Sequence, residues 1–410
     1  MRLLVVSQYF WPEDFRVNDF VVGMRERGHE VTVLTGLPNY PDGEVFPAFR
    51  ADPDAFARFG DVEVLRVPLI PRGRGAVRLM LNYLSFALTG TLLGAWKLRG
   101  RRFDAIFVFQ GSPVTSALPA LLFRRTKRAP VLMWILDLWP ESLSAVGAVR
   151  SSRVLGAVGR IVRFIYRRCD RILVQSRAFW PSVVRDGGDA ERIRYFPNWV
   201  EPVFQAGLED VETAPETRPF AGTFNVMFAG NVGEAQDMPA VLDAAEAVRD
   251  LDAVRWLIVG EGRAMDLLRA EIARRDLADR VHLLGRHPVD RMPAFFAGAD
   301  ALLVSLRPEP IFALTVPGKV QSYMVTGRPV LGMIDGEGAR VISESGGGLT
   351  APAGDGAALG AAVRRLVGMS PQERRAMGDR GRAFALREFD RDALFDQFVI
   401  WAEETIARPA

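Results

Sequence analysis

The sequence contains very few residues that form cross-links or bind transition metals. It has one cysteine, Cys169, so neither a disulfide framework nor a thiolate metal site can be built from it. A lone cysteine is typical of a small buried hydrophobic residue. The three histidines, His29, His282 and His287, are too scattered along the chain to indicate a metal cluster. We therefore expect no metal and no bound cofactor.

Two common nucleotide-binding motifs are also absent. The first apolar run, residues 3–7, leads into Gln8-Tyr9-Phe10-Trp11-Pro12-Glu13, which has none of the glycines of a dinucleotide-binding turn. Gly260-Glu261-Gly262 follows a later apolar run but lacks the third glycine, and no Walker A sequence occurs. These absences disfavour NAD-dependent and P-loop enzymes. No recognised nucleic-acid module occurs either, so we expect no nucleic-acid partner.

The first residues do not have the pattern of an export signal, and we expect them to form part of the fold. MRLLVVSQYFWPE has one basic residue, a very short apolar run and no small-residue cleavage site. The pattern predicts a buried first strand in a cytoplasmic protein, with room for peripheral contact with the inner face of the plasma membrane.

Short apolar runs alternate with amphipathic stretches through both halves of the 410 residues. This order predicts an α/β fold with two parallel sheets covered by helices. The expected strands are residues 3–7, 31–35, 62–67, 105–109, 131–136 and 171–175, then 225–229, 257–259, 281–284, 301–304 and 330–333. We predict a first lobe over residues 1–202, a linker over 203–223 and a second lobe over 224–388. The C-terminal segment 389–410 carries an amphipathic helix that must dock on another element.

Basic residues are concentrated in one part of the chain. Between Arg72 and Arg171 there are 18 Lys and Arg residues against four acidic ones, a net charge of +14, so the rest of the chain carries −11. The asymmetry predicts that the first lobe faces an anionic surface such as a membrane leaflet. Leu79–Trp96 is an uncharged run of 18 residues within this stretch, flanked by Arg72, Arg74, Arg78, Lys97, Arg99, Arg101 and Arg102. A helix pair with a buried face, a membrane-surface helix and a short span all fit this run.

Glycine-rich loops follow three expected strands of the second half. These loops are Gly230-Asn231-Val232-Gly233, Gly260-Glu261-Gly262-Arg263 and Gly285-Arg286. Ligands of open α/β sheets bind at the carboxyl ends of the strands, and glycine lets the backbone approach a phosphate there. Each loop alone is also ordinary turn chemistry.

A fourth stretch adds a positive charge. Val316-Pro317-Gly318-Lys319, with Gln321 after it, places proline in the expected first turn of a helix. The free N–H groups of a first turn, the helix dipole and Lys319 suit the diphosphate of a leaving group. The alternative is a capped helix with a surface lysine.

Taken in order, these pieces resemble the family 4 retaining glycosyltransferases of GT-B fold. The resemblance is greatest to the branch of fucosaminyl- and fucosyltransferases of O-antigen and exopolysaccharide assembly. It runs from Gln8 to about Ile342 through QYFWPEDFRVND, RGHEVTVLTGLPNYPDG, WILDLWPESL, YFPNWVE, FAGNVGEAQD, IVGEG and VPGKVQSYMVTGRPVLGMIDGEGARVI.

The resemblance implies two Rossmann-like lobes that face each other across a cleft, with the last helix crossing back to the first lobe. It implies metal-independent transfer from a nucleotide-sugar donor, a UDP- or GDP-sugar, to a lipid-linked glycan or a small-molecule acceptor. Gly285 and Arg286 would lie beside the base. The other donor-side residues would lie near the diphosphate: Gly230, Asn231, Gly233, Gly262, Arg263, Val316, Pro317, Gly318, Lys319 and Gln321.

The catalytic assignment is less direct, because the chain departs from the family pattern. Two family glutamates eight positions apart fall here on Leu314 and Ser322, and Asn231 and Gln236 stand where a basic pair is usual. A family histidine is replaced by Asp137. We take Asp137 as the first catalytic candidate, then Glu13 and Glu141, with Lys319 stabilising the leaving group and Asn18 and Trp139 on the acceptor side. Acidic residues at a helix start are the alternative for Asp137 and Glu141.

Two other functions compete with glycosyl transfer. One is epimerisation of a sugar nucleotide on the same fold, for which the three histidines are poorly placed. The other is a two-lobed sugar-binding protein without catalysis, a class that is usually exported. Glycosylation of a small-molecule natural product stays open as a variant of the transferase hypothesis.

Overall fold

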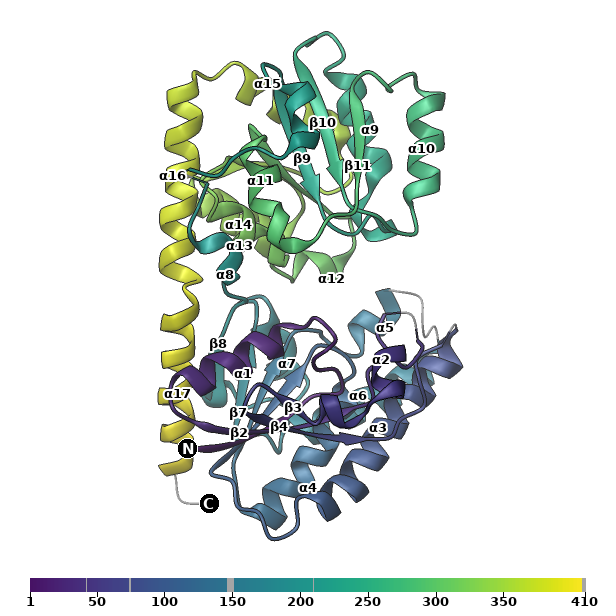
Figure 1. Cartoon of the computed structure of the whole chain (residues 1–410), viewed down its shortest axis with the longest axis vertical. Coiled ribbons are helices and arrows are strands. Elements are labelled where there is room, and N and C mark those ends of the chain that lie inside the picture. The colour runs from purple at the N-terminus through teal and green to yellow at the C-terminus, as the bar shows by residue number, and fades with distance from the viewer. Residues whose placement is uncertain (42, 74, 146–150, 209, 408–410) are drawn as a thin grey trace. The chain divides into compact units, whose positions relative to one another are not determined.

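The computed structural model describes residues 1–41, 43–73, 75–145, 151–208 and 210–407, so Arg74 lies outside the described residues. Its contacts divide the chain into two compact units. The first unit holds residues 1–197 together with those from Asp392 onward, and the second holds Asn198–Arg391. The predicted linker 203–223 therefore lies inside the second unit. Both units are α/β, as the sequence predicts (Figure 1).

In the described part of the first unit, eight strands form one sheet in the order β3-β4-β2-β1-β5-β6-β7-β8. Only the β3–β4 pair is antiparallel. The strands are β1 (Arg2–Val6), β2 (Glu30–Gly36), β3 (Arg58–Phe59), β4 (Val62–Val67), β5 (Ala105–Gln110), β6 (Val131–Ile135), β7 (Arg171–Val174) and β8 (Ile193–Tyr195). The central strands β5 and β6 are buried along their whole length, which explains their continuous apolar sequences.

Helices cover the faces of this sheet (Figure 1). They are α1 (Arg16–Glu26), α2 (Pro47–Ala51), α3 (Ala76–Lys97), α4 (Leu118–Lys127), α5 (Glu141–Ala145), α6 (Ser152–Tyr166), α7 (Phe179–Arg185) and α17 (Arg391–Ala407). The expected helix pair in the apolar run is wrong, because α3 is one continuous helix of 22 residues. No proline and no charge interrupts the run between Leu79 and Trp96.

The last helix docks on the first unit. Phe395, Phe398 and Ala402 of α17 are fully buried, as the amphipathic pattern predicts. The ring of Phe398 lies 4.8 Å from that of Phe20 in α1 and 5.3 Å from that of Phe107 in β5, measured between centroids. Figure 1 shows α17, in yellow, beside α1. The core of the first unit is therefore completed by residues from the end of the chain.

In the described part of the second unit, six parallel strands follow the order β11-β10-β9-β12-β13-β14. The strands are β9 (Phe224–Ala229), β10 (Val254–Val259), β11 (Val281–Gly285), β12 (Ala301–Ser305), β13 (Val330–Met333) and β14 (Gly348–Ala351). The helices are α8 (Pro202–Gln205), α9 (Met238–Ala247), α10 (Met265–Arg274), α11 (Met292–Ala297), α12 (Pro310–Ala313), α13 (Gly318–Met324), α14 (Gly336–Ser345), α15 (Gly356–Val367) and α16 (Pro371–Glu388).

Each sheet has one point at which the strand order reverses. In the first unit the chain passes from β1 to β2 on one side and later to β5 on the other side of β1. In the second unit β9 is flanked in the same way by β10 and β12. Ligands of open α/β sheets bind outside the carboxyl ends of the strands at such a point. The topology therefore directs attention to the loops after β1 and β5, and after β9 and β12.

Candidate active site

The loops after β9, β10 and β11 are joined by backbone hydrogen bonds. The N–H of Gly230 donates to the carbonyl of Val259 at 2.8 Å, and the N–H of Gly260 donates to the carbonyl of Gly285 at 2.7 Å. Gly260 has a φ of 145°, and a Cβ there would overlap the carbonyl oxygen of Gly230. Glycine is therefore required at Gly260 for the two loops to approach each other.

A second contact between the same loops involves Gly262. A Cβ on Gly262 would overlap the carbonyl of Val232, and the N–H of Val232 donates to the carbonyl of Glu261 at 2.9 Å. The N–H of Gly233 donates to the Gln236 side chain at 3.0 Å. The structure thus brings the predicted loop glycines together at one edge of the sheet.

Three polar side chains on these loops point to solvent. Asn231, Arg263 and Arg286 are exposed, and neither arginine forms an ion pair with any residue that the structure describes. Their role in donor binding stays a prediction.

Lys319 lies beside the first of these loops. Its side chain is half-buried, and its Nζ lies 3.7 Å from the centroid of the Phe228 ring and 2.8 Å from the position that a Cβ on Gly230 would occupy. Within the described ranges no carboxylate and no hydrogen-bond acceptor pairs with it. Burial lowers the pKa of Lys319 to about 7. This environment differs from that of a surface lysine, and an anion at Nζ would remove the penalty of burying the charge.

The position of Lys319 is fixed by Tyr323, a residue that the sequence analysis missed. The Tyr323 hydroxyl is buried, donates to the carbonyl of Ala229 at 2.9 Å and accepts from the N–H of the same residue at 3.0 Å. These bonds join α13 to the end of β9. A tyrosine on the apolar face of an expected helix was the available signal, because a buried hydroxyl needs partners.

The start of α13 differs slightly from the expectation. Pro317 is the N-cap with φ −60° and ψ 136°, and the first helical residue is Gly318, so proline does not occupy the first turn. Val316 is buried beneath this start. The Gln321 side chain is also buried, and its amide nitrogen donates to the carbonyls of Pro317 and Gly318. Gln321 therefore stabilises the turn from inside instead of presenting its amide at the surface.

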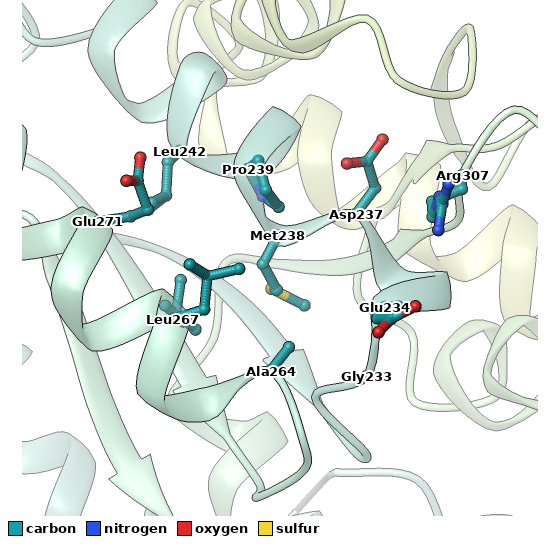
Figure 2. A pocket seen from close by; sticks show the side chains of 11 residues that line it. Gly233, Glu234, Asp237, Met238, Pro239, Leu242, Ala264, Leu267, Glu271 and Arg307 are labelled. Carbon is teal, nitrogen blue, oxygen red and sulfur yellow. The ribbon is translucent and has the colours of Figure 1, made fainter.

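A cavity of about 310 Å³ is lined by residues of the loop after β9 and of α9 and α10. Its floor is apolar, with Met238 and Leu268, and Figure 2 shows Glu234, Asp237 and Arg307 along one side and Glu271 on the other. The three carboxylates disfavour a diphosphate. Lys319 does not line this cavity, although Gly233 of the β9 loop does.

In the first unit, Glu13 and Asn18 hold the loop after β1. The Glu13 carboxylate is buried and accepts hydrogen bonds from the backbone N–H groups of Phe10, Asn39 and Tyr40, at 3.1, 2.8 and 2.8 Å. Burial raises its pKa to about 7. Asn18 accepts from the N–H of Trp11 at 3.0 Å and donates to the carbonyl of Glu13 at 2.7 Å. These contacts are those of residues that position the loops after β1 and β2.

Asp137 follows β6 and has a different environment. It is half-buried and accepts hydrogen bonds from the Trp139 indole, at 3.2 Å, and from the Ser142 hydroxyl. Burial raises the pKa of Asp137. Glu141 begins α5, which is the helix-start alternative that we considered, and pairs with Arg185. The Asp137 carboxylate also interacts with the Ser112 side chain, which follows β5, so its partners come from two loops.

A buried polar cluster lies at the β1–β5 reversal point. Asn82 of α3 accepts from Gln8 at 2.7 Å and from the Tyr9 hydroxyl at 3.2 Å. Gln110, at the end of β5, is fully buried, and its amide has no hydrogen-bond partner among the described residues. The sequence analysis missed this cluster because it considered residues 79–96 only as an uncharged apolar run.

Among the described residues, no three His, Cys, Asp or Glu side chains gather as metal ligands would. The predicted lack of a metal stays a prediction.

Comparisons with known proteins agree with this geometry. Residues 15–199 match the glycosyl transferase 4-like domain, and residues 223–368 match the glycosyl transferases group 1 domain. The two loop systems described above thus fall in a pair of glycosyltransferase domains.

Two relatives and one solved structure are similar over most of their lengths. The putative colanic acid biosynthesis glycosyl transferase WcaI of Escherichia coli is 23% identical over 80% of this chain and 82% of its own. The 2-deoxystreptamine N-acetyl-D-glucosaminyltransferase of Streptomyces fradiae is 25% identical over 92% and 91%. The structure of Anabaena HepE in complex with UDP has a TM-score of 0.71 at 16% identity and covers 98% of this chain and 100% of that one.

The fold and the domain pair define a nucleotide-sugar glycosyltransferase of GT-B fold. Within that class, the chain belongs to the family in which a glycosyl transferase 4-like domain is followed by a group 1 domain.

Proposed function

We propose that the protein transfers a sugar, with retention of anomeric configuration, from a UDP-sugar to an acceptor in bacterial surface polysaccharide synthesis. The observation that carries the proposal is Lys319, a half-buried lysine without an anionic partner among the described residues, set against glycine loops at the carboxyl end of β9. A diphosphate supplies the missing negative charge. The structural neighbour HepE was solved with UDP and with UDP-glucose, which favours uridine over guanosine.

The donor-side residues would divide the nucleotide between them. The diphosphate would lie between Lys319, the free N–H groups that begin α13 and the Gly230 loop. Arg263 and Arg286, both exposed at loop ends, would face the phosphates and the base. The sugar would be an N-acetylated amino sugar or a deoxy sugar, by the resemblance to the fucosaminyl- and fucosyltransferase branch.

In the same-face mechanism that we propose for retention, the acceptor oxygen attacks C1 from the face that the diphosphate leaves. A bond forms between the acceptor oxygen and C1, the bond between C1 and the diphosphate oxygen breaks, and the acceptor proton passes to a diphosphate oxygen. Lys319 would stabilise the charge that grows on the leaving group. Asp137 would orient the acceptor or stabilise positive charge on the sugar ring. No metal enters this proposal.

The acceptor would be a lipid-linked glycan at the inner face of the plasma membrane. The basic stretch from Arg72 to Arg171 supports contact between the first unit and anionic lipid. The Streptomyces fradiae relative is named for a small acceptor, 2-deoxystreptamine, so glycosylation of a natural product is the second candidate.

A donor screen tests the function. The protein is incubated with UDP- and GDP-sugars, with and without membrane lipid extract, and the released nucleotide and the anomeric configuration of the product are measured. We expect acceptor-dependent UDP release and a retained anomer. An inverted product would refute retention, and epimerised donor without acceptor would favour the epimerase.

Substitution of the lysine tests the site. We expect Lys319→Ala to lower turnover at least about 100-fold, because the leaving group loses its positive partner. Arg269→Ala, on the exposed face of α10, serves as a matched loss of charge in the same unit. Full activity of Lys319→Ala would remove this residue from the donor site.

A further inference from the structure

One face of α3 is apolar and open to solvent. Six exposed side chains recur every three or four residues and therefore form one stripe along the helix: Val77, Leu81, Leu84, Leu88, Leu92 and Trp96. Leu93 is also exposed, beside the stripe. Leu88, Leu92 and Trp96 expose about 60% of their surface, at 60%, 62% and 61%. A contiguous apolar stripe of this length is unusual on a soluble surface and marks an interaction site.

The ends of this stripe are basic. No acidic residue occurs between Arg72 and Phe103; Arg78 and Lys97 lie in the end turns of α3, and Arg99 and Arg102 follow it. The guanidinium of Arg99 lies 4.5 Å from the centroid of the Trp96 ring. An apolar face with leucine and tryptophan, bordered by arginine and lysine, has the composition of a helix that lies in a bilayer interface.

A second helix, α6, has the same character. Val154, Ile161 and Phe164 are exposed on α6, and the Arg168 guanidinium lies 3.7 Å from the Phe164 ring centroid. Four further arginines of α6 and its end are exposed and form no ion pair with a described residue: Arg153, Arg160, Arg163 and Arg167. Both α3 and α6 pack on the same short turn, Val114–Ala117.

The opposite face of α3 packs against other residues of the first unit. Asn82 bonds to Gln8, Tyr9 and the carbonyl of Ile70, and the Tyr83 ring lies 5.7 Å from that of Trp139 between centroids. By length and composition alone, Val77–Lys97 is long enough to cross a membrane. A crossing would strip Asn82 of these partners in hydrocarbon, which is costly. The contacts therefore favour a helix that lies along a membrane surface.

We propose that α3 and α6 together form a docking surface for an anionic lipid bilayer, with their apolar side chains in the interface and their arginines on lipid phosphates. The inference rests on the proposed function, because Tyr83 on the inner face of α3 contacts Trp139, a candidate acceptor-side residue. A docked α3 would then bring the acceptor-side groups to the membrane and favour an acceptor that keeps its lipid in the bilayer.

Vesicle flotation of the full-length protein tests the docking surface and needs no turnover. Vesicles of phosphatidylcholine alone are compared with vesicles that also contain phosphatidylglycerol. We expect binding to the anionic vesicles, and a loss of at least about tenfold in affinity for Leu84→Glu with Leu88→Glu. Ile400→Glu, an exposed apolar position on α17, is the matched control and should bind like the unchanged protein.

A second variant tests the charges separately. Arg160→Glu with Arg163→Glu should lower affinity for the anionic vesicles by about tenfold or more, with little effect on any residual binding to phosphatidylcholine. Equal binding of the unchanged protein to both vesicle types, or unchanged binding by the Leu84 and Leu88 variant, would overturn the proposal. The alternative is that a second copy of this chain covers the apolar face, and mass measurement by light scattering tests it. Self-association that the leucine substitutions abolish, without vesicle binding, would show that a second copy covers this face.

The two proposals fail separately. Vesicle binding without sugar transfer would refute the proposed function and leave the docking surface intact. Sugar transfer to a water-soluble acceptor without vesicle binding would refute the docking surface and leave the proposed function intact.

Discussion

Burial lowers the pKa of the Lys319 ammonium and raises the pKa of the Glu13 carboxyl. The two groups also differ in their hydrogen-bond partners. The Glu13 carboxylate is compensated within the protein by three backbone N–H groups. Lys319 has no such compensation among the described residues, and only the face of the Phe228 ring lies beneath its Nζ. A cation that is half-buried without an anion is expected at a site whose ligand brings the anion. This difference supports the proposed role of Lys319 in donor binding, whereas the contacts of Glu13 are those of a residue that holds loops in place.

The pKa of Lys319 predicts a pH dependence for nucleotide binding. Below about pH 7 the free protein already carries the charge, and above it the neutral Lys319 amine must take up a proton when the diphosphate binds. Affinity for UDP should therefore fall as pH rises above about 7, by at most about tenfold per pH unit for one proton. Isothermal titration calorimetry in buffers of different ionisation enthalpy measures the proton uptake directly.

Lys319→Arg is the control for this pH dependence, because the guanidinium stays charged throughout the range. The variant should bind UDP with a flatter pH profile. An equally steep profile in the variant would assign the titration to the nucleotide phosphate or to another group.

The lowered pKa of Lys319 also makes the stability of the folded protein depend on pH. The unfolded lysine keeps the ordinary pKa of 10.5, and the folded one titrates near 7. The cost of burying the charge is present in full below about pH 7 and disappears as pH rises toward 10.5. Removing the charge with Lys319→Met should therefore raise the unfolding temperature at pH 6 and have little effect above the unfolded pKa, as thermal denaturation at several pH values would measure.

Tyr323 provides a prediction about hydrogen bonding. Tyr323→Phe leaves the N–H and the carbonyl of Ala229 without their partner, so we expect a loss of about 1–3 kcal/mol in the free energy of unfolding. The KM for the donor should also rise, since α13 and the β9 loop lose their connection. Urea denaturation and steady-state kinetics measure the two effects.

Tyr166→Phe is a matched control, because the Tyr166 hydroxyl is buried and has no hydrogen-bond partner in the described part of the chain. Its removal should leave stability unchanged or slightly higher. Equal losses in both variants would refute the role given to the Tyr323 hydroxyl.

At the scale of the element, the sequence predicted buried strands better than edges. Of the strands of the first sheet, β3 and β8 were missed, and both are edge strands of two or three residues. In the second sheet the missed strand is the edge strand β14. An edge strand is buried on fewer sides, so its sequence lacks the continuous apolar run that marks β5 or β9. The glycine loops were predicted for the same reason that the central strands were, because they directly follow those runs.

The sequence predicted those site residues whose role follows from the residue type and its position in a motif. It missed those whose role depends on a contact in the folded structure. Lys319 and the loop glycines could be found from spacing. That Gln321 is buried beneath its turn, or that Tyr323 bonds to Ala229, depends on how α13 packs on β9, which spacing does not encode. The same holds for Glu13, whose three N–H partners come from two loops separated by more than 20 residues.

The docking of α17 supports a prediction at this scale. Phe398 is fully buried against Phe20 and Phe107, so Phe398→Ala should cost about 3–5 kcal/mol in the free energy of unfolding. Ile400, on the same helix, is 49% exposed, and Ile400→Ala should change stability by no more than about 0.5 kcal/mol. Denaturant titration of both variants tests the assignment of faces, and a larger loss for Ile400→Ala would contradict it.

At the scale of the whole molecule, the two units differ in how the chain builds them. The second unit is one continuous segment, Asn198–Arg391, with its own apolar core on both faces of its sheet. The first unit is interrupted, because its core includes Phe395 and Phe398 from beyond the second unit. The first unit can therefore complete its core only after the entire chain has been synthesised.

Because of this difference, we expect the second unit to bind the donor without the first. All of the predicted donor residues, from Gly230 to Gln321, lie within the continuous segment 198–391. That fragment should unfold cooperatively by itself and bind UDP within about tenfold of the affinity of the full chain, because it keeps Lys319, Tyr323 and the three glycine loops. The fragment 1–197 should fold poorly until a peptide with the sequence of α17 is added, since Phe20 and Phe107 would otherwise be exposed to solvent. Calorimetry on the two fragments measures both expectations. If UDP binds only to the full chain, the first unit contributes to the nucleotide site, and the diphosphate contacts proposed for Lys319 are not sufficient to hold the donor.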